Sequence, residues 1–139
     1  MKKPTMKSAE KLADKWFSIY IRLRDSDFRG NVKCITCSSS DYYKGPNMNC
    51  GHFQSRSHKY TRWHDRNANG QCVGCNKWKS GDQYNHGRMI DLKFGKGTAE
   101  EMVALARATI KRTVAEVKEI ADKYKKLAEV EAAKRGIEL

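Results

Sequence analysis

The sequence lacks any apolar run close to the roughly 20 residues that cross a bilayer. Residues 1–17 also lack the apolar stretch of a secretory signal. Hydrophobic residues make up 39% of the 139 positions, which suffices for one small core but not for two independent cores. We therefore expect neither a membrane protein, nor a secreted disulfide scaffold, nor a large multi-domain enzyme.

Acidic residues are scarce as well. The chain carries 16 Asp+Glu against 28 Lys+Arg, a formal net charge of +12. Basic and acidic residues number nine and four over residues 1–33, ten and four over 34–97, and nine and eight over 98–139. We expect a polyanionic partner, nucleic acid first, that meets the N-terminal and central parts of the chain.

The first third of the chain predicts one basic amphipathic helix over residues 8–24. Apolar side chains recur there at helical spacing: Leu12, Trp16, Ile19, Tyr20 and Leu23. Lysines and arginines occupy the other faces, and we expect Lys11, Lys15 and Arg22 to contact phosphates. The chain divides into this basic segment (1–30), a cysteine-rich core (31–97) with a short helix near 82–94, and a C-terminal helical region (98–139). Together they form one integrated domain.

The C-terminal region carries a heptad-like apolar stripe. The tetrapeptide from Thr98 to Glu101 matches a capping box, and no Gly or Pro interrupts the following helical pattern before Gly136. The stripe comprises Val103, Ala106, Ile110, Val114, Val117, Ala121, Tyr124 and Ala128. Two interpretations stay open: two helices folded back on themselves, or one long helix that packs against a second copy in a homodimer.

Four cysteines form two CxxC motifs, Cys34 with Cys37 and Cys72 with Cys75. Two such knuckles present four thiolates to one tetrahedral zinc, and a metal would stabilise a central module that has little apolar core. A redox pair is the alternative, but the thioredoxin-like βαβ pattern is missing. The fifth, Cys50, is a buried small hydrophobe, a spare thiol or a ligand of a second site.

Polar residues with catalytic potential lie between and after the knuckles. His52 follows Cys37 by 15 residues, Asn67 precedes Cys72 by five, and Asn76 directly follows Cys75. Taken singly, the asparagines are ordinary turn or cap residues. Three further histidines are expected elsewhere: His58 and His64 in solvent or against phosphate, and His86 on a helix surface. Tyr60, Trp63 and Trp78 either stack on unpaired bases or cover the zinc module.

The order of His52, Asn67 and Asn76 among the knuckles resembles the HNH, or His-Me finger, nucleases. Phage endonuclease VII, a Holliday-junction resolvase of that superfamily, likewise has an Asn after its second knuckle. The resemblance implies an α+β fold: a small zinc-stapled ββα-metal, treble-clef-like centre, a basic N-terminal helix and a long C-terminal helical region.

A closer resemblance covers nearly the whole chain and points to the NinG/Rap recombination proteins of lambdoid phages. The matching blocks are Lys3-Pro4-Thr5, Lys15-Trp16-Phe17, Tyr20 to Arg24, Cys34 to Cys37, Asn49 to Phe53, Arg56, Arg62, Asn67, Gln71-Cys72, Cys75-Asn76 and Ser80-Gly81. This family is implied to cut branched recombination intermediates, namely Holliday junctions and D-loops, in the cytoplasm of a bacterial host. Other phage recombination proteins are further partners that it implies.

The residue types suit phosphodiester cleavage. A neutral imidazole at His52 is a base near pH 7, and the amide oxygen of Asn76 is a ligand for Mg²⁺ or Mn²⁺. Asn67 holds the loop or orients His52. Many HNH enzymes have an acidic metal ligand just before the histidine, but Gly51 stands here. The second ligand is therefore open among Asp65, Cys50, His64 or another histidine.

The expected contacts to DNA are made by Lys11, Lys15, Arg22, Arg56, Arg62 and Lys77, with Arg56 or Arg62 clamping the scissile phosphate. The leading hypothesis is a divalent-metal-dependent endonuclease for branched DNA, which acts as a homodimer because a four-way junction needs two nicks. Two alternatives remain: a non-catalytic zinc module that binds branched or single-stranded DNA, and a duplex HNH nuclease.

Overall fold

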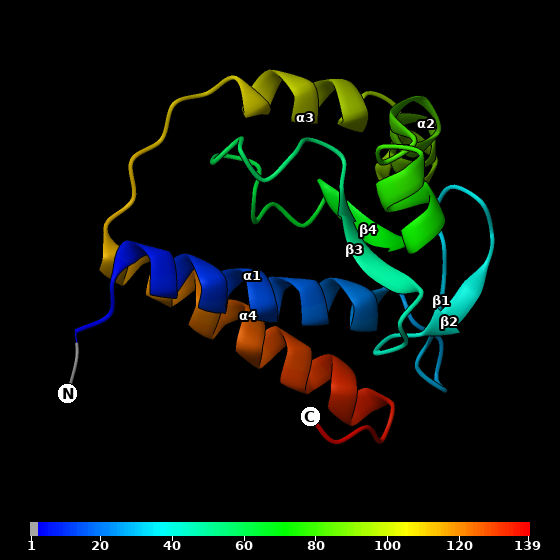
Figure 1. Cartoon of the computed structure of the whole chain (residues 1–139), viewed down its shortest axis with the longest axis horizontal. Coiled ribbons are helices and arrows are strands. Elements are labelled where there is room, and N and C mark those ends of the chain that lie inside the picture. The colour runs from blue at the N-terminus through cyan, green and yellow to red at the C-terminus, as the bar shows by residue number, and fades with distance from the viewer. Residues whose placement is uncertain (1–2) are drawn as a thin grey trace.

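The computed structural model describes residues 3–139, and residues 1–2 of the predicted basic segment lie outside this range. Helices and short strands mix in the order α1 (Met6–Arg24), β1 (Asn31–Lys33), β2 (Ser40–Tyr42), β3 (Met48–His52), β4 (Ala68–Cys72), η1 (Gly74–Trp78), α2 (Gln83–Phe94), α3 (Thr98–Ala106) and α4 (Val114–Lys134). This confirms a small mixed α+β structure (Figure 1). Among the described residues, no helix is both long enough and apolar enough to cross a membrane.

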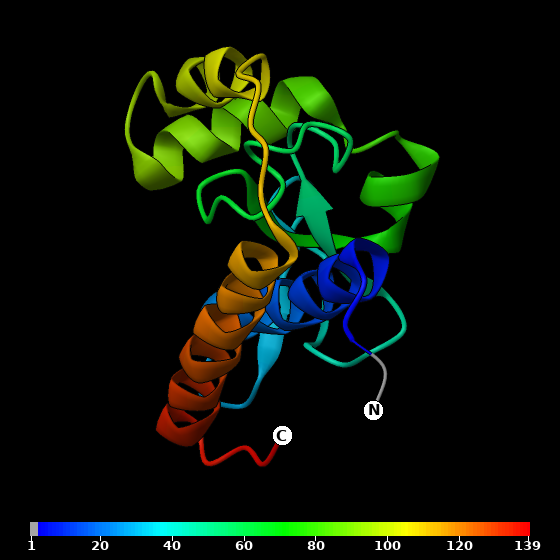
Figure 2. The ribbon, with the colours of Figure 1, turned by 90° about the vertical axis from the view of Figure 1, so that its left-hand side faces the viewer.

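Helix α1 confirms the predicted basic N-terminal helix. It begins at a capping box in which Thr5 and Ser8 exchange side-chain and backbone hydrogen bonds. One face is fully apolar and packs along α4, and Figures 1 and 2 show the two helices side by side. The shared core contains Ala9, Ala13, Phe17, Ile21, Trp63, Ala68, Val117, Ala121 and Tyr124. Small alanines on both helices allow the close approach that buries Phe17 and Tyr124 edge to face, 4.9 Å apart.

The C-terminal region forms two helices, so the interpretation as one continuous helix is wrong. Residues 107–113 form an extended link between α3 and α4, which Figure 2 shows running between the two helices. The capping box predicted at Thr98 does not form, because Thr98 donates its hydroxyl to Gly95 O at 2.7 Å. The capping box instead joins Thr113 and Glu116 and opens α4. Propensity alone does not stop a helix here; the packing of α4 on α1 does.

The heptad-like stripe is consequently split between two places. Its α4 part, Val117, Ala121, Tyr124 and Ala128, is buried inside the chain. Val103 and Ala106 lie on α3, where Val103 packs against a separate small cluster of Phe53, Ile90 and Met102, and Ile110 lies in the link. The stripe therefore serves the fold of one chain, and it is not available as the predicted surface for a second copy.

Two antiparallel hairpins complete the molecule. Strand β1 pairs with β2, and β3 pairs with β4 so that His52 lies opposite Ala68 and Cys50 opposite Gly70. The second hairpin lies across α1 (Figure 1), and the loop 53–67 connects its strands. Helix α2 confirms the helix expected near 82–94 and ends at Gly95, whose φ of 118° is open to glycine. The second hairpin, the loop 53–67 and α1 contribute walls to a cleft.

Candidate functional site

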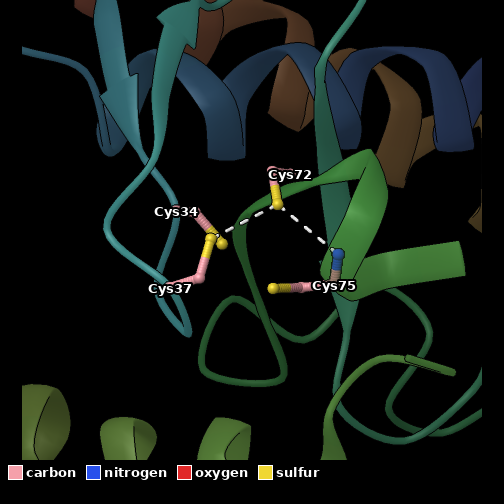
Figure 3. A group of neighbouring side chains, drawn as sticks. All are labelled: Cys34, Cys37, Cys72 and Cys75. Atoms are coloured by element: carbon pink, nitrogen blue, oxygen red, sulfur yellow. Dashed lines mark hydrogen bonds between the residues drawn. The ribbon is translucent and has the colours of Figure 1, made fainter. Parts of the chain in front are cut away.

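The two CxxC knuckles converge, as the sequence predicts. The Sγ atoms of Cys34, Cys37, Cys72 and Cys75 all lie within 4.8 Å of one another, and Figure 3 shows the four side chains turned toward a common centre. Backbone groups shape each knuckle: Cys34 N donates to Ser39 O at 2.7 Å, and Cys75 N donates to Cys72 Sγ at 3.4 Å. Four thiolates at this spacing fit a tetrahedral metal such as zinc.

The cysteine centre joins distant parts of the chain. It connects the turn after β1 to the turn after β4, and it lies beside the core cluster that contains Val32, Tyr43 and Met48. Cys34 and Cys75 also belong to that cluster, so a bound metal would reinforce contacts between the two segments that apolar packing already makes. Cys75 and Asn76 are consecutive residues of η1, so the centre is directly attached to the segment that carries Asn76.

A cleft of about 660 Å³ lies against β3. Its walls come from α1, from β3 with the start of the loop 53–67, and from η1 with the turn before α2. The lining side chains are Asp14, Ser18, Arg22, Met48, Asn49, Cys50, His52, Ser55, Arg56, Asn76, Ser80 and Gln83. The cleft thus brings together four residues predicted from the sequence: His52, Asn76, Arg22 and Arg56.

His52 is held in one tautomer. Its Nε2 lies 2.9 Å from Arg62 O, and because a carbonyl only accepts, Nε2 carries the proton. The other ring nitrogen, Nδ1, makes no hydrogen bond within residues 3–139 and is not among their buried atoms. Burial lowers the pKa of His52 below its ordinary value of 6.5. The imidazole is therefore neutral near pH 7, with a lone pair available as a base.

Asp14 of α1 fixes the loop that holds His52, and sequence reasoning missed it. Its carboxylate accepts two hydrogen bonds from Arg62, at 3.0 and 2.7 Å, and one from Trp63 Nε1 at 2.9 Å. Arg56 lies 3.5 Å away, on the cleft side. The carboxylate therefore positions the backbone of Arg62, and Arg62 O in turn orients the imidazole. An acidic side chain between Lys11 and Lys15 on a basic helix was the available signal.

Asn67 lies outside the cleft and holds the loop. Its side chain is fully buried, accepts from Gln54 N at 2.8 Å, and donates to Gln54 O and Thr61 O at 2.9 and 3.1 Å. All of its polar atoms are used on backbone groups. Of the two roles predicted for Asn67, this geometry fits the one in which it holds the loop. The Asn67 side chain makes no direct hydrogen bond to His52.

The donor set for a second metal is small. Asn76 lines the cleft and its amide makes no hydrogen bond within residues 3–139. Asp14 is the one carboxylate that lines the cleft, and it is already engaged by arginines. Asp65, the predicted second ligand, does not line the cleft and lies 3.6 Å from His64 Nδ1 instead. In the described part of the chain, only the cysteine centre groups three or more His, Cys, Asp or Glu side chains suitably for a metal.

The glycine before His52 has a packing reason. A Cβ at Gly51 would lie 2.7 Å from Gln71 Cβ. Gln71 is itself fixed, because Nε2 donates to Gly81 O at 2.8 Å and to Thr36 Oγ1 at 3.2 Å. An acidic side chain at this position would clash with Gln71 unless Gln71 moved.

The predicted phosphate-binding residues divide into two groups. Arg62 is committed to Asp14 and Glu10, and Arg22 donates to Tyr43 O and Ser18 O, which leaves it part-buried at the base of the cleft. Arg56 is 63% exposed at the rim. Lys11, Lys15 and Lys77 are exposed and form no ion pair within the described residues.

The helical spacing connects the free lysines to the cleft. Lys11 and Lys15 lie seven and three residues before Ser18, and Lys15 lies seven before Arg22, so all four occupy one side of α1. Ser18 and Arg22 line the cleft. The cleft therefore continues into a basic strip along the exposed side of α1.

Cys50 and the three other histidines lie in different environments. Cys50 lines the cleft and packs against the core shared by α1 and α4, and burial raises the pKa of its thiol to about 12, so the thiol is protonated near pH 7. His58 is exposed, while His64 accepts from Arg66 N at 3.2 Å. The surface position expected for His86 is wrong: it is completely buried, and its Nε2 lies 3.2 Å from Asn69 Nδ2.

Fold and site together define a small α+β protein with a four-cysteine cluster that fits a metal ion and a basic cleft that contains an oriented histidine. The family described as the bacteriophage lambda NinG protein matches residues 1–135. The chain belongs to this NinG family, as the sequence predicts. Comparison with curated proteins and with solved structures gave no match.

Proposed function

We propose that this protein is an endonuclease of the HNH type that cuts branched DNA during phage recombination. The family connects it to phage recombination. The observation that carries the nuclease is His52, whose Nδ1 is unprotonated and accessible inside a cleft that also contains Arg22 and Arg56. A base facing cationic side chains suits hydrolysis of a phosphodiester.

In the proposed reaction, His52 Nδ1 accepts a proton from a water molecule as its oxygen attacks the phosphorus. A P–O bond forms, the bond from phosphorus to the 3′ oxygen breaks, and the 3′ oxygen takes a proton from solvent. The products are a 5′ phosphate and a 3′ hydroxyl. Arg56 at the rim has the freedom to contact the scissile phosphate, and Arg22 adds positive charge at the base of the cleft.

Divalent-metal dependence is part of the proposal. Asn76 would provide one amide oxygen to Mg²⁺ or Mn²⁺, with water and DNA phosphate oxygens as the remaining ligands, as is common for Mg²⁺. A metal bound there would supply positive charge to stabilise the leaving 3′ oxygen. The structural zinc of the cysteine centre and the ββα arrangement of β3, β4 and the segment from η1 complete the proposed HNH-type, treble-clef-like module.

DNA would lie across the cleft and the basic strip of α1. Lys11, Lys15 and Lys77 contact the phosphate backbone, so affinity is independent of sequence and falls steeply with salt. Two nicks in a four-way junction require two active sites, which we propose that a two-fold homodimer provides. The dimer surface cannot be the buried α4 stripe, and light scattering of the protein with and without junction DNA tests the oligomeric state.

The test compares cleavage of a Holliday junction, a D-loop and linear duplex by wild type and His52→Ala, with Mg²⁺, Mn²⁺ or EDTA. We expect wild type to cut the branched substrates in Mg²⁺ or Mn²⁺, and His52→Ala to bind them without cutting. Equal cutting of linear duplex would favour a duplex nuclease. Zinc-loaded wild type that binds junctions and never cuts would favour a non-catalytic branched-DNA-binding protein.

A further inference from the structure

Two aromatic side chains stand in solvent beside the cleft. Trp78 is 84% exposed and Tyr84 is 78% exposed, among the most exposed large hydrophobic side chains in the described chain. Trp78 ends η1 and lies between Asn76 and Ser80, which both line the cleft, while Tyr84 directly follows Gln83, which also lines it. Both residues are therefore immediate sequence neighbours of cleft-lining residues, although neither ring is itself part of the lining.

Their surroundings are polar and basic. Trp78 lies between Lys77 and Lys79, both exposed, and the guanidinium of Arg88 lies 5.8 Å from the centroid of the Tyr84 ring. Neither ring belongs to a core cluster of the described residues. Isolated rings among cations suit a polyanion with flat apolar groups, because each unpaired base offers a face to stack on and each nucleotide carries a phosphate.

Trp78 and Tyr84 differ in exposure from Trp63, which the sequence also offered as a stacking residue. Trp63 is buried beneath Arg62 and Arg112, whose guanidiniums lie 5.0 and 5.2 Å from its ring, so it belongs to the core. Trp78 and Tyr84 contribute little to folding stability through burial, because both side chains are largely exposed to solvent.

We propose that Trp78 and Tyr84 form a stacking rim that binds unpaired nucleotides at a DNA branch and places the adjoining backbone in the cleft. This inference rests on the DNA-binding part of the proposed function and adds a basis for choosing branched over continuous DNA. A base-paired duplex keeps its bases stacked on one another, so the rim engages only where pairing is interrupted.

The test measures binding in EDTA, where a metal-dependent nuclease does not cut. The probes are a branched DNA with 2-aminopurine in an unpaired stretch and a matched continuous duplex. We expect Trp78→Ala with Tyr84→Ala to weaken binding of the branched probe by about ten-fold or more, with loss of the 2-aminopurine fluorescence change. Duplex affinity should change less than about two-fold, since the phosphate contacts remain.

Phe28→Ala is the matched control, because Phe28 is 83% exposed and no residue within two positions of it in the sequence lines the cleft. It should leave both affinities unchanged, and Trp78→Phe should retain branched binding. The rim is refuted if the double variant binds the branched probe as wild type does, or if it loses both probes equally. Wild type that stacks the probe but never cuts in Mg²⁺ or Mn²⁺ would support the rim and refute the nuclease. Normal branch-selective cutting without the two rings would refute the rim alone.

Discussion

Substitution of Asp14 by asparagine tests how the cleft orients its base. The carboxylate makes three hydrogen bonds of 2.7 to 3.0 Å to Arg62 and Trp63, and its side chain is 20% exposed. Asparagine keeps one acceptor oxygen but turns an amide N–H group toward an arginine donor. Charge-assisted hydrogen bonds contribute about 1.5–3 kcal/mol each, reduced here by partial exposure, so we expect unfolding to become easier by about 2 kcal/mol.

The catalytic consequence follows from the backbone of the same residue. Arg62 O fixes His52 Nε2, so a displaced loop lets the imidazole turn and admits water around it. We expect kcat to fall about ten-fold or more, with KM little changed, because a misoriented base loses part of the usual 10²–10⁴-fold contribution. Burial lowers the pKa of His52, so looser packing should raise this pKa. As the pH is lowered, the variant should therefore lose activity at a higher pH than wild type does.

The assay is single-turnover cleavage of a Holliday junction across a pH series, with urea unfolding of the same samples. Glu10→Gln is the matched control, because Glu10 makes one contact of 3.1 Å to the far side of Arg62. It should change stability by less than about 1 kcal/mol, because glutamine keeps an acceptor oxygen for this single contact, and it should leave the pH profile in place. An Asp14→Asn protein that is less stable yet has wild-type kcat and pH dependence would refute the positioning role.

Three further outcomes are expected. Cys75→Ser should lose the metal and with it cooperative folding, and a zinc-free variant with a wild-type melting curve would contradict the structural role of the centre. Gly51→Ala should destabilise the protein by about 1–3 kcal/mol in urea, because its Cβ meets Gln71 at 2.7 Å, whereas an unchanged midpoint would show that Gln71 yields. His86 has a pKa lowered by burial to about 4, from 6.5. It is neutral in the fold and takes up a proton on unfolding, so wild-type stability should fall by about 2 kcal/mol more than that of His86→Gln between about pH 7 and pH 5; equal slopes in urea titrations would refute this.

Local signals predicted the elements well where they were strong. The period of apolar residues gave α1, the glycines after Phe94 gave the end of α2, and the two CxxC spacings gave the cysteine centre. Each of these depends on neighbours within about one or two turns, or on residue types with few alternative uses. The family resemblance, which covers many short blocks in order, was confirmed over residues 1–135.

The failures involve contacts between distant segments. The stretch 107–113 contains no Gly or Pro, and its extended course depends on α4 packing along α1 and on Arg112, which donates to Lys59 O at 2.8 Å. His86 was predicted to lie on a helix surface because nothing in the local sequence indicates its hydrogen bond with Asn69. The amide of Asn69 is itself oriented by Arg24 and Lys93, which donate to its oxygen.

The candidate site was half predictable for a related reason. His52 and Asn76 follow motifs, so their roles were inferred from order and residue type. Arg62 was expected to hold DNA phosphate, but it is a guanidinium paired with Asp14, a residue 48 positions earlier. Only the fold reveals that pairing.

The cleft is therefore assembled from parts that are stabilised separately. His52 is held by the loop and α1, on the core shared with α4, whereas Asn76 is held by the cysteine centre that immediately precedes it. Removal of zinc should release η1 and the Asn76 wall while the α1–α4 core and the orientation of His52 persist longer. Limited proteolysis after mild chelation would then cut first near residues 72–82, and first cuts in α4 would show that the two parts unfold as one.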